Sequence, residues 1–195
     1  MPTAIDPADV DTNKDLDYVV LSESGDSLLV KNGDGAGGTV SLLSTPIDLG
    51  AGSAPVAQLL GDVNGDGADD VLTANFGTDE VSILRSWGTS LYLPVDYPLG
   101  SAPQSLALAD FDNDGDLDLA VSAIGTSDRE IVIARNDTED ANTIVFSDIG
   151  SPVNSGTEPT LLVTGDVDGD GLDDLVSITQ VDVLDVSGIN GVAWD

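Results

Sequence analysis

One pattern limits the fold of this 195-residue chain more than any other feature, and it occurs four times. Each copy has a proline followed, seven residues later, by an aspartate that opens an Asp-rich stretch. The copies lie roughly 50 residues apart, a period typical of solenoids, propellers and other repeat arrays. The four pairs are Pro2 and Asp9, Pro55 and Asp62, Pro103 and Asp110, and Pro159 and Asp166.

Each copy also contains short apolar runs, separated by Gly, Asp, Asn and Ser. In the second copy they are Val56–Leu60, Asp70–Ala74, Val81–Leu84 and Leu91–Val95. Runs of this length, rich in Val, Leu and Ile, predict strands, and no stretch has the apolar spacing and caps of a helix. The strand before the first Asp-rich stretch, Thr3–Ala8, is expected to be poor because it contains Asp6 and Pro7.

Four strands in about 50 residues are typical of a propeller blade, so we expect an all-β chain, a β-propeller built from four-stranded antiparallel blades. A solenoid of β-coils and stacked sandwich domains are the alternatives. The expected blades are residues 2–54, 55–102, 103–158 and a shorter fourth, 159–195. Because the fourth unit is short, we expect the chain to be part of a larger propeller. A closed propeller of four blades is the alternative.

The Asp-rich stretches place oxygen-bearing residues at positions 1, 3, 5, 7 and 9. In a tight loop alternate residues converge on one centre; position 7 contributes its backbone carbonyl, and glycine at position 6 permits the sharp turn. Six to eight hard oxygen ligands favour Ca²⁺ over Mg²⁺. The predicted ligands are Asp9, Asp11, Asn13, Asp15 and Asp17 in loop 1; Asp62, Asn64, Asp66, Ala68 and Asp70 in loop 2; Asp110, Asp112, Asp114, Asp116 and Asp118 in loop 3; and Asp166, Asp168, Asp170, Leu172 and Asp174 in loop 4.

Loop 1 departs from this pattern because Lys14 stands where the other loops have Gly67, Gly115 and Gly171. The expectation is therefore three to four Ca²⁺ ions. Ordinary Asp-Gly turns are the plainer interpretation of one such loop, but three near-identical loops at one spacing argue against it. An EF-hand would need Glu at position 12, where the sequence has Val20, Thr73, Val121 and Ser177.

Charge and composition exclude several classes of function. The chain has 36 acidic and 5 basic residues, a net charge of −31, which leaves no cationic surface for nucleic acid or anionic lipid. It has no Cys and no His, so thiolate or imidazole metal sites and Ser–His–Asp catalysis are impossible. No apolar run is long enough to insert as a membrane helix.

Three strings resemble the FG-GAP/VCBS repeats of secreted bacterial proteins and integrin α-subunits: GDVNGDGADDVLTAN, GSAPQSLALADFDNDGDLDLAVS and VTGDVDGDGLDDLVS. The Gly-rich Lys31–Gly38 and the pair Phe76–Gly77 resemble further parts of that repeat. The resemblance implies propeller blades with Ca²⁺ in the loop between the first two strands, bound by the residues named above. It also implies an extracellular or cell-surface protein that serves adhesion, scaffolding or binding of a protein or carbohydrate ligand.

We expect no enzymatic activity and no catalytic residues, because the metal loops already explain the abundant aspartates. The alternative is the propeller portion of a polysaccharide lyase or hydrolase with paired carboxylates. Asp79, Asp96, Asp128 and Asp185 share no evident motif and are expected to be solvated turn residues. The aromatic residues Trp87, Tyr92, Tyr97 and Trp194 either line a sugar-binding surface or, as is more common, pack between blades.

Overall fold

A computed structural model describes residues 2–33, 41–42, 46–87, 90–91, 93–124, 130–148, 153–154 and 159–179. These residues form antiparallel strands, and the one helical element among them is a single 3₁₀ turn, η1 (Glu23–Gly25). The all-β prediction is confirmed for this part of the chain. It contains no helix long and apolar enough to cross a membrane.

The strands form four consecutive antiparallel sheets. Sheet 1 has the order β1 (Pro2–Ala8), β2 (Asp17–Ser22), β3 (Ser27–Asn32), β4 (Ser41–Leu42), and β5 (Ile47–Asp48) also pairs with β3. Sheet 2 runs β6 (Pro55–Gly61), β7 (Asp70–Asn75), β8 (Glu80–Leu84), β11 (Val95–Tyr97), and β9 (Ser86–Trp87) with β10 (Ser90–Leu91) forms a separate ribbon. Sheet 3 runs β12 (Pro103–Ala109), β13 (Asp118–Ala123), β14 (Glu130–Asn136), β15 (Phe146–Asp148), with β16 (Val153–Asn154) also on β14; sheet 4 is β17 (Pro159–Gly165) with β18 (Asp174–Thr179).

Each sheet opens with the same hairpin. The last residue of its first strand pairs with the aspartate at position 9 of the loop, as Ala8 does with Asp17 and Ala109 with Asp118. Near the opening proline, every one of these hairpins also has a register shift. The Asp-rich loops therefore leave equivalent strands in equivalent register.

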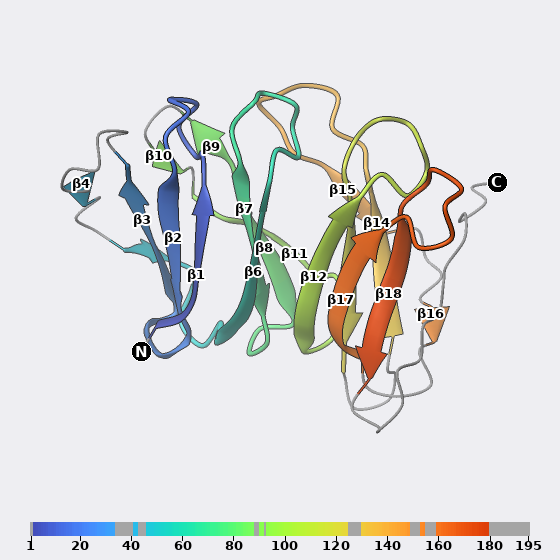
Figure 1. Ribbon diagram of the computed structural model, residues 1–195. Helices are drawn as coiled ribbons and strands as arrows, with labels where there is room; N and C mark the ends of the chain where they lie inside the picture. The colour runs from blue at the N-terminus through green and yellow to red at the C-terminus, as the bar shows by residue number, and fades with distance from the viewer. Residues whose placement is uncertain are drawn as a thin grey trace.

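Neighbouring sheets pack face to face in a row, with β1, β6, β12 and β17 following one another (Figure 1). Three apolar clusters fill the three junctions between successive sheets. Every residue of β7 and of β13 is buried, because both faces of these strands are covered. The sheets at the two ends of the row, sheets 1 and 4, lie far apart in Figure 1.

Two strand predictions were wrong. The expected poor strand is in fact a complete β1, and Pro7 is tolerated because β1 is an edge strand that pairs with β2 alone among the described residues. The single strand expected over Leu91–Val95 is divided, since β10 ends at Leu91 and β11 begins at Val95. The blade boundaries stay a prediction, and Tyr92, Asp128, residues 34–38 of the Gly-rich segment and residues 180–195, with Trp194, lie outside the described residues.

Candidate metal centres

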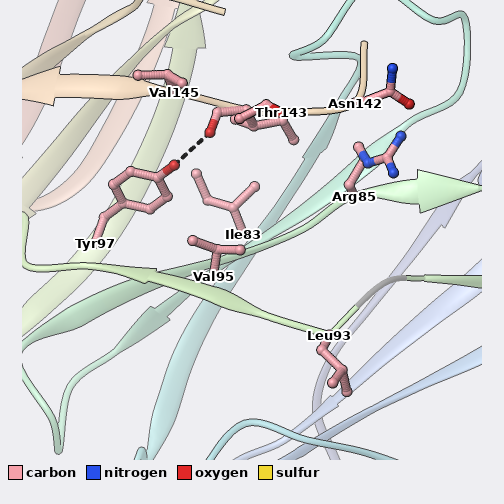
Figure 2. A pocket seen from close by; sticks show the side chains of 9 residues that line it. Ile83, Arg85, Leu93, Val95, Tyr97, Asn142, Thr143 and Val145 are labelled. Carbon is pink, nitrogen blue, oxygen red and sulfur yellow. Dashed lines mark hydrogen bonds between the residues drawn. The ribbon is translucent and has the colours of Figure 1, made fainter. Parts of the chain in front are cut away.

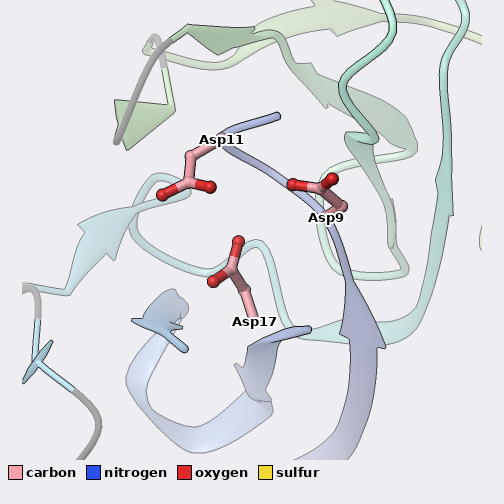
Figure 3. Close-up of side chains that lie close together, drawn as sticks. All are labelled: Asp9, Asp11 and Asp17. Atoms are coloured by element: carbon pink, nitrogen blue, oxygen red, sulfur yellow. The ribbon is translucent and has the colours of Figure 1, made fainter. Parts of the chain in front are cut away.

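Three of the four loops bring three carboxylates together. In loop 1 one carboxylate oxygen each from Asp9, Asp11 and Asp17 lies within 4.8 Å of the other two (Figure 3). Loops 3 and 4 form the same group at the same positions, 1, 3 and 9 of the loop. Those groups are Asp110, Asp112 and Asp118, and Asp166, Asp168 and Asp174.

Backbone N–H groups hold the loop side chains turned inward. In loop 3 the N–H of Gly115 donates to Asp110 at 3.0 Å, that of Asp114 to Asp112 at 3.2 Å, and that of Asp116 to Asp114 at 3.0 Å. Equivalent bonds to the residues at positions 1, 3 and 5 occur in the other three loops. Such side-chain-to-backbone turns define the loop before any ion binds.

The aspartate at position 9 has a second role, because it is buried and joins three segments of its sheet. Asp118 accepts the N–H of Phe111 in the loop at 3.0 Å on Oδ2 and the N–H of Asn136 on β14 at 2.8 Å on Oδ1. Asp17 and Asp70 make the same pair of bonds, to Val10 and Gly33 and to Val63 and Ser86. These residues therefore connect the loop to the end of the third strand.

Burial makes these carboxylates hard to ionise without a cation. Loss of solvent raises the pKa of Asp70 to about 7 and that of Asp118 to about 6, and the neighbouring loop carboxylates add to the effect. The pKa of Asp17 is raised for the same first reason. Since the ionised form binds metal, a cation would replace the bound proton at these positions.

We expect the metal-free protein to lose stability as the pH rises from 5 to 7.5. The folded-state pKa values of Asp70 and Asp118 lie above the ordinary value of 3.8, so the folded state holds protons that the unfolded state has released. Their stabilising contribution is complete below pH 3.8, decreases as pH rises, and is gone once pH has passed 6 for Asp118 and 7 for Asp70. At about 1.4 kcal/mol per pKa unit, the loss between pH 5 and 7.5 is about 4 kcal/mol. Urea unfolding in EDTA measures it, and Asp70→Asn should flatten the slope; an unfolding free energy that stays constant or rises over this range contradicts the prediction.

Lys14 adopts the conformation that glycine has in the other loops. Its φ is 69°, against 90°, 101° and 92° at Gly67, Gly115 and Gly171. Its N–H also donates to Asp9 at 3.0 Å, as the N–H of Gly67 does to Asp62. The missing glycine is therefore accommodated by a strained lysine, and loop 1 keeps the shape of the others.

Replacing this lysine by glycine, Lys14→Gly, is expected to raise the free energy of unfolding. Removing the left-handed strain stabilises the folded state by about 1–2 kcal/mol. Glycine also makes the unfolded chain more flexible, which offsets about 0.7 kcal/mol of this gain. The reciprocal change Gly115→Lys should destabilise loop 3 by at least as much, and urea denaturation of both variants provides the comparison. A loss of stability in Lys14→Gly would mean that loop 1 does not have this backbone.

Loop 1 also has buried acceptors that no protein donor satisfies. Asp9 Oδ1 and Asn32 Oδ1 are buried without a hydrogen-bond partner, while Asn32 Nδ2 donates to Asp11 Oδ2 at 2.9 Å. A buried acceptor without a partner is costly, and a cation removes that cost for an oxygen that it contacts. Asp9 therefore fits a cation site. Asn32 contacts that site from the end of β3; it lies in the segment Lys31–Gly38 that resembles the repeat, but its residue type and spacing did not predict a place at the metal site.

Loop 2 is the exception. Asn64 stands at position 3, so this loop has no carboxylate there, and Asn64 Nδ2 donates to the carbonyl of Ala141 at 3.0 Å. Asp69 connects loop 2 to loop 1, because it accepts the N–H of Asp9 at 3.1 Å and donates its own N–H to Asp9 O at 2.9 Å. The predicted ligands at positions 5 and 7 are outside the three acidic groups, and their part in binding stays a prediction: Asn13, Asp15, Asp66, Ala68, Asp114, Asp116, Asp170 and Leu172.

Two acids outside the loops proved to have a structural role. Asp79 accepts the N–H of Ala102 at 2.7 Å, and Asp26 accepts those of Gly52 and Ala54 at 2.9 Å each. Both precede the third strand of their sheet and hold the turn before the next sheet. Asp79 is an exposed turn residue, as expected, and its bond to Ala102, 23 residues away, gives it a structural role that the sequence did not indicate.

Tyr97 packs between sheets. Its hydroxyl donates to the carbonyl of Ile144 at 2.7 Å, and its ring meets Phe146 edge-on at 6.2 Å. Beside it lies a cavity of about 680 Å³, lined by apolar side chains between residues 83 and 97, by Arg85, and by residues 142–145 (Figure 2). No carboxylate lines this cavity. Trp87 is different, since it is 58% exposed with the guanidinium of Arg85 5.4 Å from its ring centre.

The sequence profile of the FG-GAP-like repeat matches this chain twice, over residues 9–73 and 62–121. The chain belongs to the FG-GAP-like repeat family. Each match begins at position 1 of one Asp-rich loop and runs through the next loop into the strand that follows it, so each match contains two of the loops. No match was found among curated proteins. Loop 4 lies beyond both matches, yet its acidic group has the geometry of those in loops 1 and 3.

Proposed function

We propose that this chain is a calcium-binding module of the β-propeller type, placed outside the cell or on its surface, that serves as a scaffold or binds a protein or carbohydrate ligand. The observation that carries the proposal is the set of three acidic groups, each with its oxygens within 4.8 Å, at one position in three separate repeats.

Electrostatics supports a cation in each group. Two carboxylates about 4.8 Å apart repel by about 3 kcal/mol at an effective dielectric constant of 20, and each group contains three such pairs. A divalent cation converts this repulsion into attraction. Oxygen-only ligands on a flexible loop suit Ca²⁺, whereas Mg²⁺ requires a strict octahedron and keeps several waters.

The row of sheets supports the propeller arrangement. The first strands β1, β6, β12 and β17 follow one another, and each sheet covers the face of the next, as blades do around an axis. Extracellular Ca²⁺, near 1 mM, suits modules with dissociation constants of about 10⁻⁴–10⁻³ M. Location and ligand class rest on the family alone.

A propeller portion of a polysaccharide lyase or hydrolase is the second candidate. It needs two carboxylates that face each other in a pocket away from the metal loops. The apolar cavity beside Tyr97 offers none, and Asp26 and Asp79 are engaged with backbone N–H groups. These observations favour a binding module without catalysis, and the net charge of −31 disfavours nucleic acid as a partner.

Calorimetric titration with Ca²⁺, after removal of bound metal, tests the proposal. Three ions per chain are expected from loops 1, 3 and 4, with a fourth, weaker site if loop 2 binds through Asp62, Asn64, Asp66 and Asp70. The double variant Asp110→Asn/Asp112→Asn should bind one ion fewer, and Asp79→Asn, an acid outside the loops, should not change the count. Absence of heat with Ca²⁺, or a count that the loop 3 variant does not change, would refute it.

A further inference from the structure

The two ends of the row of sheets expose apolar side chains at repeat positions that are more buried in the two sheets between them. The residue after the position-9 aspartate is buried at Val71, Leu119 and Leu175, where it packs at the junction with the preceding sheet. Its equivalent in sheet 1, Tyr18, is 41% exposed. On the neighbouring first strand, Ile5 is 62% exposed where the equivalent Leu106 and Leu162 are buried.

Sheet 4 shows the same departure on its opposite face. Ile178 is 37% exposed, whereas the equivalent Leu21, Ala74 and Ser122 are fully buried by the sheet that follows. Leu161 and Val163 on β17 are each 45% exposed. Leu161 pairs with Ile178 and Val163 with Val176, so these side chains share one face.

We call these surfaces the head face and the tail face. The head face lies on sheet 1 and consists of Ile5, Pro7, Tyr18, Val20 and Leu29, which strand pairing places on one side of the sheet, with Lys31 opposite Tyr18 at the edge of this face. The tail face lies on sheet 4 and consists of Leu161, Val163, Val176 and Ile178. The two faces are at opposite ends of the row (Figure 1).

We propose that the head face of one copy of this chain packs on the tail face of a second copy. The three internal junctions are the evidence for this occupant, because each pairs a tail-type face with the head-type face of the next sheet. A second copy supplies both missing partners. A contact between two different surfaces closes into a ring if the rotation allows. The described parts of two copies contain eight such sheets, within the range of closed propellers.

The inference extends the propeller part of the proposed function and does not depend on which ion the loops bind. The net charge of −31 opposes association, so the experiment belongs at about 0.3 M salt, where the Debye length is below 8 Å, and with Ca²⁺ present. If the protein binds calcium but stays monomeric, the proposed association is wrong and the proposed metal sites still stand.

Sedimentation and light scattering over about 1–200 µM test the contact, with a mass twice the 19.9 kDa of one chain expected. Ile5→Asp and Val163→Asp each place an unpaired charge in the contact and should weaken association about thirtyfold or more. Both positions are exposed in one copy, so both variants should fold. Leu93→Asp, at a residue 81% exposed away from both faces, is the matched control and should associate like the parent.

Mixing the two variants distinguishes head-to-tail contact from the alternatives. Ile5→Asp keeps a native tail face and Val163→Asp keeps a native head face, so the mixture should recover one contact and form a mixed pair that neither variant forms alone. A parent that is monomeric at every concentration, or association that survives both substitutions, would overturn the proposal. A head-to-head dimer would survive Val163→Asp and a tail-to-tail dimer would survive Ile5→Asp, and either result would also overturn it.

Discussion

Calcium is expected to raise the free energy of unfolding by about 4 kcal/mol when loops 1, 3 and 4 are each at tenfold the dissociation constant. One site at that saturation contributes about 1.4 kcal/mol if the ion binds the folded state alone. For a chain of this size the sum corresponds to a rise of roughly 8–16 °C in Tm. Differential scanning calorimetry in about 5 mM Ca²⁺, 5 mM Mg²⁺ and EDTA measures it.

Calcium stabilises the fold because it offsets the repulsion between the carboxylates of each acidic group, which destabilises the metal-free protein. The rise should be clearly smaller with Mg²⁺, because the loops offer no rigid octahedron. Asp110→Asn/Asp112→Asn should reduce the calcium-dependent gain by about a third and leave the stability in EDTA equal or higher, since it removes two repelling charges. Equal Tm values in Ca²⁺ and in EDTA would contradict both the prediction and the metal assignment.

Asp118→Ala is expected to cost about 4 kcal/mol in saturating Ca²⁺. The substitution leaves the buried N–H groups of Phe111 and Asn136 without an acceptor, at about 1–3 kcal/mol each, and removes a carboxylate from loop 3. Against a total stability of about 5–15 kcal/mol this is a large loss. Urea unfolding followed by circular dichroism measures it.

The control is Asp116→Ala, two residues earlier in the same loop, where the side chain is exposed and the predicted ligand is the backbone carbonyl. It should change stability by less than about 0.5 kcal/mol. In EDTA the cost of Asp118→Ala should be smaller, because burial already opposes ionisation of Asp118 and raises its pKa to about 6. If the two alanine variants are equally stable in Ca²⁺, Asp118 does not join the loop to the third strand.

Several contacts could not be predicted from the sequence, because they join segments that only tertiary packing brings together. Asn32 contacts the loop 1 group from β3, and Asp69 joins loop 2 to loop 1. Asp26 holds a turn that begins 26 residues after it. In each case a polar residue contacts a residue that is distant in the sequence, and the spacing of nearby residues cannot predict such a contact.

Other features were determined by the sequence alone, because they depend on local order. The proline-to-aspartate repeat, the hairpin around each Asp-rich loop, and the meeting of carboxylates at positions 1, 3 and 9 follow from alternation over fewer than about ten residues. The tertiary structure decided which of these oxygens are buried, that Lys14 could take a glycine conformation, and which apolar faces are covered. Burial is set by the sheet on either side, so identical repeat positions such as Leu119 and Tyr18 end up covered in one sheet and exposed in another.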